Sequence, residues 1–186
     1  VLDADVGTVI YPKILTLGDR DGCSGVTCVM EQGAPEMIKE SLHARSRPIE
    51  VVHPPLSFGS GLDSFSLLRQ AYVLTRQLGG PRHRIRAAFQ KAAQAQEEYE
   101  QGLSDIGQRT IDFGNENNLP VVVVSGSLHV IHDKIINAGI PKLLRINGVL
   151  TMPMDCFPIP QSVDPIPRIH WAELKREMRM GLAARE

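Results

Sequence analysis

A run of four valines, Val121 to Val124, constrains the fold more than any other stretch of the chain. The run follows Pro120 and ends at Ser125-Gly126, so it is short, apolar and β-branched. Such a run is typical of a strand that is buried on both faces, as the strands of a parallel sheet are. We therefore expect a parallel sheet, with helices in the connections between its strands.

The residues after the valine run complete a strand–loop–helix–strand unit. A polar patch spans 129–133, an apolar helix-like segment follows and stops at Gly148, and a second strand is predicted over 149–152, just before Asp155-Cys156. Units of this βαβ type carry their ligands at the carboxyl ends of the strands. The polar residues after each strand therefore mark the expected position of a site.

The rest of the chain also alternates between strand-like and helix-like segments. Apolar β-branched runs indicate strands, apolar residues at three- and four-residue steps indicate helices, and glycine-rich stretches indicate loops. The predicted strands are 6–11, with 13–17 as its prolongation or a loop wall, and 49–53; the predicted helices are 35–43, 62–78, 82–113 and 171–185; the predicted loop is 18–27. The pattern predicts an α/β protein with one long helix.

The long helix carries an apolar stripe from Ile85 to Phe113, which we expect to face inward. Gly102 and Gly107 weaken the helix and are expected at a bend. Its amino end, 82–86, is basic, which is unfavourable against the helix dipole. These charges either form a solvated face or meet a cofactor phosphate or a neighbouring domain.

The composition narrows the class of function. With 186 residues and a formal net charge of -1, the chain lacks the bulk positive charge that recruits nucleic acid. No apolar run approaches the roughly 20 residues needed to cross a bilayer, and the acidic start does not resemble a secretion signal. Because the chain begins without Met, directly before a strand, we expect it to be a piece of a longer protein.

The three cysteines are Cys23, Cys28 and Cys156. An odd number without a secretion signal predicts reduced thiols in a cytoplasmic protein. They are either two loop cysteines and one small apolar residue, or soft ligands for iron or zinc. Cys28 precedes a predicted helix, whose positive amino end favours the thiolate that metal binding requires.

The loop histidines admit more than one interpretation. A zinc hydrolase would need the HExxH pattern around His129 and His132, and the chain does not contain it. Histidines that bind the loop backbone, or a small-molecule site without a metal over 126–133, are the other interpretations. Asp133 is predicted to cap the helix that follows. Gly59-Ser60-Gly61 lacks the GK[ST] of a phosphate loop and is interpreted as a flexible turn.

The segment VVVVSGSLHVIHDKIINAGIPKLLRINGVLTMPMDCFPIP resembles a pattern of the activator-related proteins of 2-hydroxyacyl-CoA dehydratases, the CoA-substrate-specific enzyme activases. That pattern is VVxxGRPYxxYDxxxNxGIPxxLxxxGxxVxxxDxLP. The matching residues are Gly126, Asp133, Asn137, Gly139, Ile140, Pro141, Gly148, Asp155 and Pro158. Cys28 to Pro35 is similar to the family's CPxxQGxP segment, and 52–58 to the strand and loop that follow it. The resemblance spans about residues 5 to 160.

The resemblance implies a Rossmann-like three-layer α/β domain with a mostly parallel sheet, helices on both faces and one long helix. It also implies a relation to dehydratase subunits that bind an iron–sulfur cluster through three cysteines. Cys28 is the carried-over ligand candidate for a 4Fe–4S cluster, with Cys23 and Cys156 as additional candidates. The predicted cofactor-binding residues of the loop are Gly126, His129, Asp133 and Asn137.

The sequence departs from the family pattern in two places. Gly-Arg-Pro-Tyr is replaced by Gly126-Ser127-Leu128-His129, which removes an arginine and a tyrosine from the loop. Cys-Pro is replaced by Cys28-Val29, and an earlier cysteine–proline segment of the family is not found in this chain.

The resulting hypothesis is a module of an ATP-dependent acyl-CoA dehydratase or reductase activase system that holds a cluster for one-electron transfer. Its expected partners are other domains of the parent chain, an ATPase activator component and an acyl-CoA, with no nucleic acid and no membrane. The alternative is a non-catalytic Rossmann-like scaffold that docks other domains without a metal. The predicted domain spans 1–160, followed by a proline-rich strap and terminal helix over 161–186.

Overall fold

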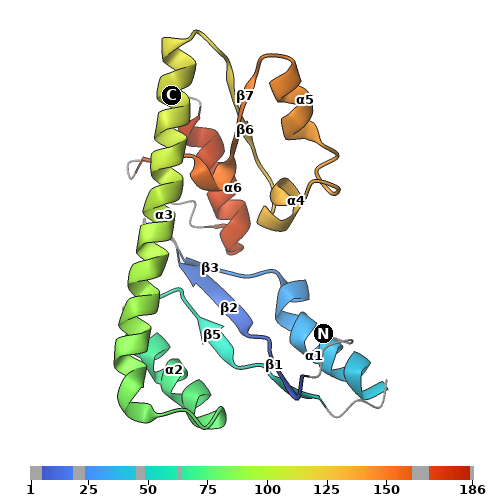
Figure 1. The fold of residues 1–186 in the computed structure, drawn as a ribbon, viewed down its shortest axis with the longest axis vertical. Helices are drawn as coiled ribbons and strands as arrows, with labels where there is room; N and C mark the ends of the chain where they lie inside the picture. Colours follow the sequence, from blue (N-terminus) through green and yellow to red (C-terminus); the bar gives the residue numbers. More distant parts are fainter. Residues whose placement is uncertain (1–5, 19–23, 45–48, 63, 161–167, 185–186) are drawn as a thin grey trace. The chain divides into compact units, whose positions relative to one another are not determined.

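The computed structural model of the protein describes residues 6–18, 24–44, 49–62, 64–160 and 168–184. Figure 1 shows their helices and strands. The strands are β1 (Thr8–Ile10), β2 (Lys13–Gly18), β3 (Ser24–Val26), β4 (Glu50–Val52), β5 (Pro55–Ser57), β6 (Val121–Val124) and β7 (Leu150–Pro153). The helices are α1 (Val29–Ala44), α2 (Phe65–Gln77), η1 (Arg82–Arg84), α3 (Ile85–Glu116), α4 (Leu128–His132), α5 (Ile140–Ile146), η2 (Met154–Cys156) and α6 (Ala172–Ala183).

The chain forms two compact units. Unit 1 comprises Val1–Ala93 and Pro167–Ala172, and unit 2 comprises Gln94–Ile166 and Glu173–Glu186. α3 begins in unit 1 and continues into unit 2. The predicted domain boundary at residue 160 stays a prediction, because the residues that follow it, 161–167, lie outside the described part of the chain.

Unit 1 is built on parallel pairing that continues past two prolines. β1 pairs with β4 and β2 pairs with β5, both parallel. Between the two pairs, Tyr11 N donates to Val52 O at 2.9 Å and Lys13 N donates to Pro54 O at 2.9 Å. Of the two alternatives predicted for 13–17, a strand is observed, but it is a separate strand, β2, in another sheet than β1. α1 packs on β2 and β4, and α2 packs on β5.

The structure corrects two predictions in unit 1. The predicted loop over 18–27 contains β3, which pairs antiparallel with β2. The first helix begins at Val29 rather than Pro35, so Pro35 lies inside α1. An interior proline removes a helical hydrogen bond at a cost of about 3 kcal/mol, and the complete burial of the Pro35 ring offsets part of that cost.

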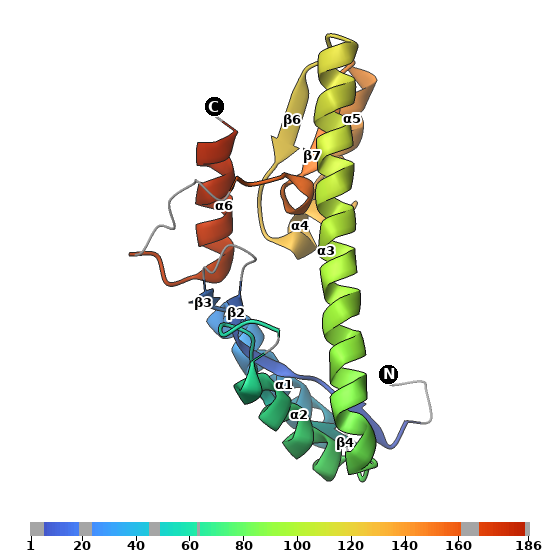
Figure 2. The same cartoon turned by 90° about the vertical axis from the view of Figure 1, so that its left-hand side faces the viewer.

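Unit 2 contains the predicted βαβ unit. β6 and β7 pair in parallel, with Val121 opposite Leu150 and Val124 opposite Pro153. The connection runs through α4, a turn and α5, and Gly148 ends α5 in the left-handed conformation (φ 77°), as predicted. Figure 2 shows β6 and β7 between α6 and α3. The buried residues Ile131, Met154 and Met180 form a core cluster, and Val123 and Val124 of the valine strand pack against it.

The fold class is confirmed: the protein is mixed α/β, with mainly parallel strand pairs and one long helix. The described strands are distributed over three small sheets, β1-β4, β3-β2-β5 and β6-β7. The terminal helix predicted over 171–185 is observed as α6.

α3 packs on the sheet of unit 2 through two glycines. A Cβ atom on Gly107 would lie only 1.8 Å from the Cys156 carbonyl oxygen, and one on Gly114 would lie 2.5 Å from Val121 Cγ2. Both glycines are buried, and α3 continues through them without interruption. Gly107 therefore permits close approach of the helix to the backbone that follows β7. The bend predicted at Gly102 and Gly107 stays a prediction.

The predicted inward stripe of α3 is only partly buried. Ile85 is 5% exposed, but Ile106 is 47% and Phe113 is 52% exposed. Gly107 directly follows Ile106, and Gly114 directly follows Phe113. Successive residues of an α-helix are rotated by about 100° around its axis, so the glycine face lies about 100° from these side chains. The apolar stripe and the packed face are thus different faces of the same helix.

Replacing Gly107 by alanine should destabilise unit 2 by about 1–3 kcal/mol, because the added methyl group overlaps the Cys156 carbonyl. Gly102→Ala is the matched control: a Cβ there meets nothing within 4 Å, so the gain in helix propensity should stabilise the chain by about 0.5–1 kcal/mol. Urea unfolding followed by circular dichroism measures both. Equal stability of the two variants would contradict the close packing.

Candidate functional site

The candidate site lies at the carboxyl ends of β6 and β7. Because the two strands are parallel, the residues that follow them meet at one edge of the sheet. Ser125 to His132 follow β6, and Met154 to Cys156 follow β7. The edge predicted from the sequence is therefore present in the structure.

The central contact of this edge joins a histidine to a buried carboxylate. His132 Nε2 lies 3.0 Å from Asp155 Oδ2. The Asp155 side chain is 5% exposed, whereas that of His132 is 50% exposed. Within the described residues, Asp155 Oδ1 is buried without a hydrogen-bond partner. A carboxylate in this position holds one ring nitrogen of His132 and leaves Nδ1 for a ligand at the open edge.

α6 closes the other side of the pair. Arg176 donates from Nη2 to the Asp155 backbone oxygen at 3.2 Å. Ser127 donates from Oγ to Glu173 Oε2 at 3.2 Å, which ties the loop after β6 to the same helix. The arrangement is an imidazole oriented by a carboxylate, with an arginine on the backbone oxygen of the same aspartate, and such an imidazole can accept or donate a proton.

The sequence placed His132 in the polar patch after the first strand and Asp155 after the second, but their pairing was not predicted. They are 23 residues apart, and only the parallel register of β6 and β7 brings the segments that carry them together. The available signal was the position of each residue shortly after a predicted strand. Asp155 was also among the residues that match the family pattern.

Two of the predicted cofactor-binding residues shape the loop between β6 and α5. Asp133 Oδ1 accepts hydrogen bonds from the amides of Ile135 at 2.8 Å and Ile136 at 2.9 Å. Asn137 donates from Nδ2 to Ile131 O and accepts from Gly139 N, both at 2.9 Å. These side chains thus fix the path of the backbone, whatever else they bind.

The pKa of Asp133 is lowered by the amide of Ile136, then by that of Ile135, while desolvation opposes the shift. Because the pKa is lower in the folded than in the unfolded chain, these hydrogen bonds add stability at pH values above the unfolded pKa. This stability is lost as the pH falls through the folded pKa. Asp133 caps this turn and not a helix, which corrects the prediction. α5 begins only at Ile140, because Pro141 favours the first turn of a helix.

The other two predicted residues differ in their surroundings. Gly126 has φ 146°, and a Cβ there would lie 3.2 Å from Ile131 Cγ2. His129 is exposed on α4. Gly126, His129, Asp133 and Asn137 thus all lie in the connection between β6 and α5, which also carries His132.

The predicted cysteine ligands fall in different parts of the chain. Cys28 is half-buried in unit 1, at the amino end of α1, and Cys156 is buried in unit 2. Cys23 lies outside the described residues. Within the described ranges, no three His, Cys, Asp or Glu side chains are grouped so that they could hold a metal ion.

The surroundings of Cys28 hold it in place. Its carbonyl oxygen accepts from Gln32 N at 3.1 Å, and Gln32 Nε2 donates to Thr27 O at 3.1 Å. Thr27 is buried and bonds through its amide and hydroxyl to the backbone of β2. The glutamine of the CPxxQGxP-like segment therefore secures the first turn of α1 behind the cysteine.

A family model described as "CoA enzyme activase uncharacterised domain" matches residues 1–157. The chain belongs to this family. The match includes both strand–helix–strand regions and ends one residue beyond η2, so the His132–Asp155 pair lies within it. Comparison with curated proteins and with solved structures gave no match.

The family membership confirms the predicted relation to CoA enzyme activases. It also identifies the chain as an activase-type module. Among the helices of the described ranges, none has the length and apolar character needed to cross a membrane.

Cys156 should resist a thiol-alkylating reagent in the folded chain, while Cys28 should react. Burial raises the pKa of the Cys156 thiol above its ordinary value, and Asp155 raises it further, although Arg176 lowers it. Because the folded pKa is raised, the protonated thiol adds stability at pH values below the unfolded pKa, and this stability is lost as the pH rises through the folded pKa.

Peptide mass spectrometry after alkylation, with and without urea, measures this difference. Cys156 should become reactive only in urea, and Cys156→Ala should weaken the loss of stability at alkaline pH. Equal alkylation of the two thiols in the folded chain would show that Cys156 is not protected.

Proposed function

We propose that the chain is a partner-docking module of an ATP-dependent system that activates an acyl-CoA dehydratase or reductase. The family supports the role in a CoA enzyme activase. The partner in this proposal is the ATPase activator component or another domain of the parent chain, and the acyl-CoA is the substrate of the complete system. The module supplies a rigid surface that brings these components together.

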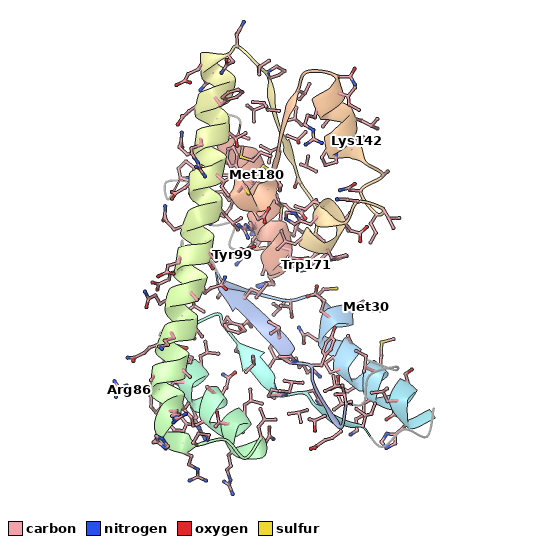
Figure 3. The ribbon with its side chains drawn as sticks, viewed as in Figure 1. Met30, Arg86, Tyr99, Lys142, Trp171 and Met180 are labelled. Carbon is pink, nitrogen blue, oxygen red and sulfur yellow. The ribbon has the colours of Figure 1, made fainter. Side chains whose placement is uncertain are left out.

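The observation that carries the proposal is the apolar amino end of α1. Val29 is 79% and Met30 is 67% exposed, and both belong to the segment that resembles the family's CPxxQGxP. Figure 3 shows Met30 at this end of the helix. Large apolar side chains that are exposed to solvent on an ordered helix are characteristic of contact surfaces, where methionine is enriched.

The helix that presents these side chains is anchored to unit 1. Thr27 fixes its start to β2, and Lys13 Nζ forms a salt bridge with Glu36 Oε1 at 2.9 Å. Leu42 packs in the core near its other end. A pre-ordered helix loses little conformational entropy on binding, so the exposed residues can contribute their full contact area.

Val29→Asp combined with Met30→Asp should weaken binding to the ATPase activator component by about tenfold or more, because a charge replaces apolar contact area. Phe65→Asp is the matched control: Phe65 is 80% exposed on α2 of the same unit, so its replacement changes exposure and charge to a similar extent. Isothermal titration calorimetry of the folded variants measures the effect. Because the control adds one negative charge and the test variant two, Met30→Asp alone is compared with Phe65→Asp as well. Equal losses for these two single variants, or no binding by the unmodified chain, would contradict the proposal.

A second candidate function is cluster binding through Cys28. The position of its half-buried thiol, just before the first turn of α1, favours this role. The described residues alone do not complete a cluster site, so in this proposal Cys23 and donors from a partner supply the ligands besides Cys28. Cys156, the third cysteine predicted as a ligand, lies in unit 2. A 4Fe–4S cluster held there would supply one-electron transfer.

Cys28→Ala should remove all iron and sulfide that the chain binds after anaerobic purification, because one lost thiolate opens the cluster. Cys156→Ala is the control with a buried thiol and should retain them if the cluster lies at α1. Iron and sulfide analysis and the visible absorption spectrum measure both, with and without the activator component. A chain that holds no iron even after reconstitution with that component has no cluster role.

A further inference from the structure

The outer face of α5 and the turn before it form an exposed apolar surface in unit 2, here called the α5 face. Its exposed apolar residues are Ile135, Ile136, Ile140, Leu143 and Ile146. Ile135 is 88% and Leu143 is 58% exposed. Single exposed apolar residues are ordinary, but five within twelve positions of one loop and helix indicate a contact surface.

The α5 face is basic as well as apolar. Residues 134–152 contain Lys134, Lys142 and Arg145 and no acidic residue, and all three basic side chains are exposed. Lys142 lies on α5 (Figure 3). A partner for this face must therefore combine apolar side chains with negative charge.

The same unit presents a second surface of that complementary kind. On α3, Tyr99, Ile106 and Phe113 recur every seven residues and are all about half exposed. This spacing places them on one stripe, here called the α3 face. The stripe is distinct from the face of Gly107 and Gly114, which packs on the sheet.

The α3 face is bordered by acidic residues. Residues 94–116 contain six acidic side chains and one basic side chain, Arg109. Asp105 and Asp112 each precede a residue of the stripe, and they accept hydrogen bonds from the amides of Gln101 at 2.8 Å and Gln108 at 2.9 Å. Because these donors are neutral, the bonds leave the negative charge of both carboxylates in place.

We propose that two copies of this chain associate through unit 2, the α5 face of each copy on the α3 face of the other. A two-fold axis makes such a contact reciprocal and closed, so it uses both surfaces of both copies. In each half of the contact the isoleucine and leucine side chains meet the Tyr99–Ile106–Phe113 stripe. Lys134 and Lys142 meet Asp105 and Asp112. This association is independent of the docking role of α1 in unit 1.

Charge reversal on one face at a time provides the test. The first variant carries Lys134→Glu and Lys142→Glu, and the second carries Asp105→Lys and Asp112→Lys. Sedimentation velocity of the unmodified chain should show a two-chain species that weakens with added salt. Each variant alone should associate at least about tenfold more weakly, because like charges then face one another.

Mixing the two variants should restore association, because in a reciprocal contact both halves then pair opposite charges. Arg69→Glu with Arg76→Glu on α2 of unit 1 is the control and should associate like the unmodified chain. Leu143→Ser and Ile106→Ser test the apolar part separately; both change exposed positions, so they should fold normally and associate more weakly.

Three results would overturn the proposal. The first is a chain that stays monomeric at every concentration. The second is a two-chain species that is insensitive to all four changes of charge and to both serine variants. The third is a mixture of the two reversed variants that associates no better than either one alone.

Discussion

The arrangement of unit 2 depends on the close contact between α3 and the backbone that follows β7. Gly107 has room for no side chain, because the Cys156 carbonyl occupies the space of its Cβ. This contact holds η2 against the helix, buries Met152 and Cys156, and leaves Asp155 to face the loop after β6 and α6. The position of the His132–Asp155 pair thus follows from a steric constraint on a residue far from it in sequence.

The residues that match the family pattern serve mainly to shape the backbone. Asp133 and Asn137 bind amide and carbonyl groups of their own loop, and Gly139 and Gly148 adopt positive φ angles. In the amino-terminal segment, Gln32 bonds to Thr27 and Pro35 is buried. The matching residues therefore fix the backbone of two turns. The positions where this chain departs from the pattern, Ser127 to His129, face outward or contact α6.

Much of this fold could be predicted from local signals. The strand at the four valines, the glycine stop at Gly148 and the long helix α3 each reflect a preference of a few neighbouring residues, and these elements were confirmed. The burial expected on both faces of the valine strand was wrong: among the described strands β6 pairs only with β7, and Val122 is 38% exposed. β3 could not be predicted, because Ser24-Gly25-Val26 has little strand preference of its own and is ordered by pairing with β2. The burial of Pro35 inside a helix was missed for a similar reason, since tertiary packing overrides the local preference of proline.

The candidate site was only partly predictable. The rule for parallel strands located the edge, but neither the pairing of His132 with Asp155 nor the contact from Arg176 can be derived without knowing the register and the position of α6. The face of α3 that packs on the sheet was also mistaken, because apolar periodicity marks surfaces that avoid water without identifying what covers them. The packed face is the one that carries Gly107 and Gly114. In a sequence, however, a glycine that permits close packing cannot be distinguished from one that interrupts a helix.

The pairing of β2 with β3 gives the two units different routes to the native state. It is antiparallel and joins residues close in sequence, with Leu17 opposite Gly25, so this hairpin can form on the timescale of microseconds. The strands of a parallel pair, in contrast, are separated by a long connection that contains a helix, α1 between β2 and β5 and α5 between β6 and β7. These pairs therefore form between residues distant in sequence. Unit 1 therefore contains a local strand pair on which α1 can assemble, whereas the strand pairing described in unit 2 is entirely non-local.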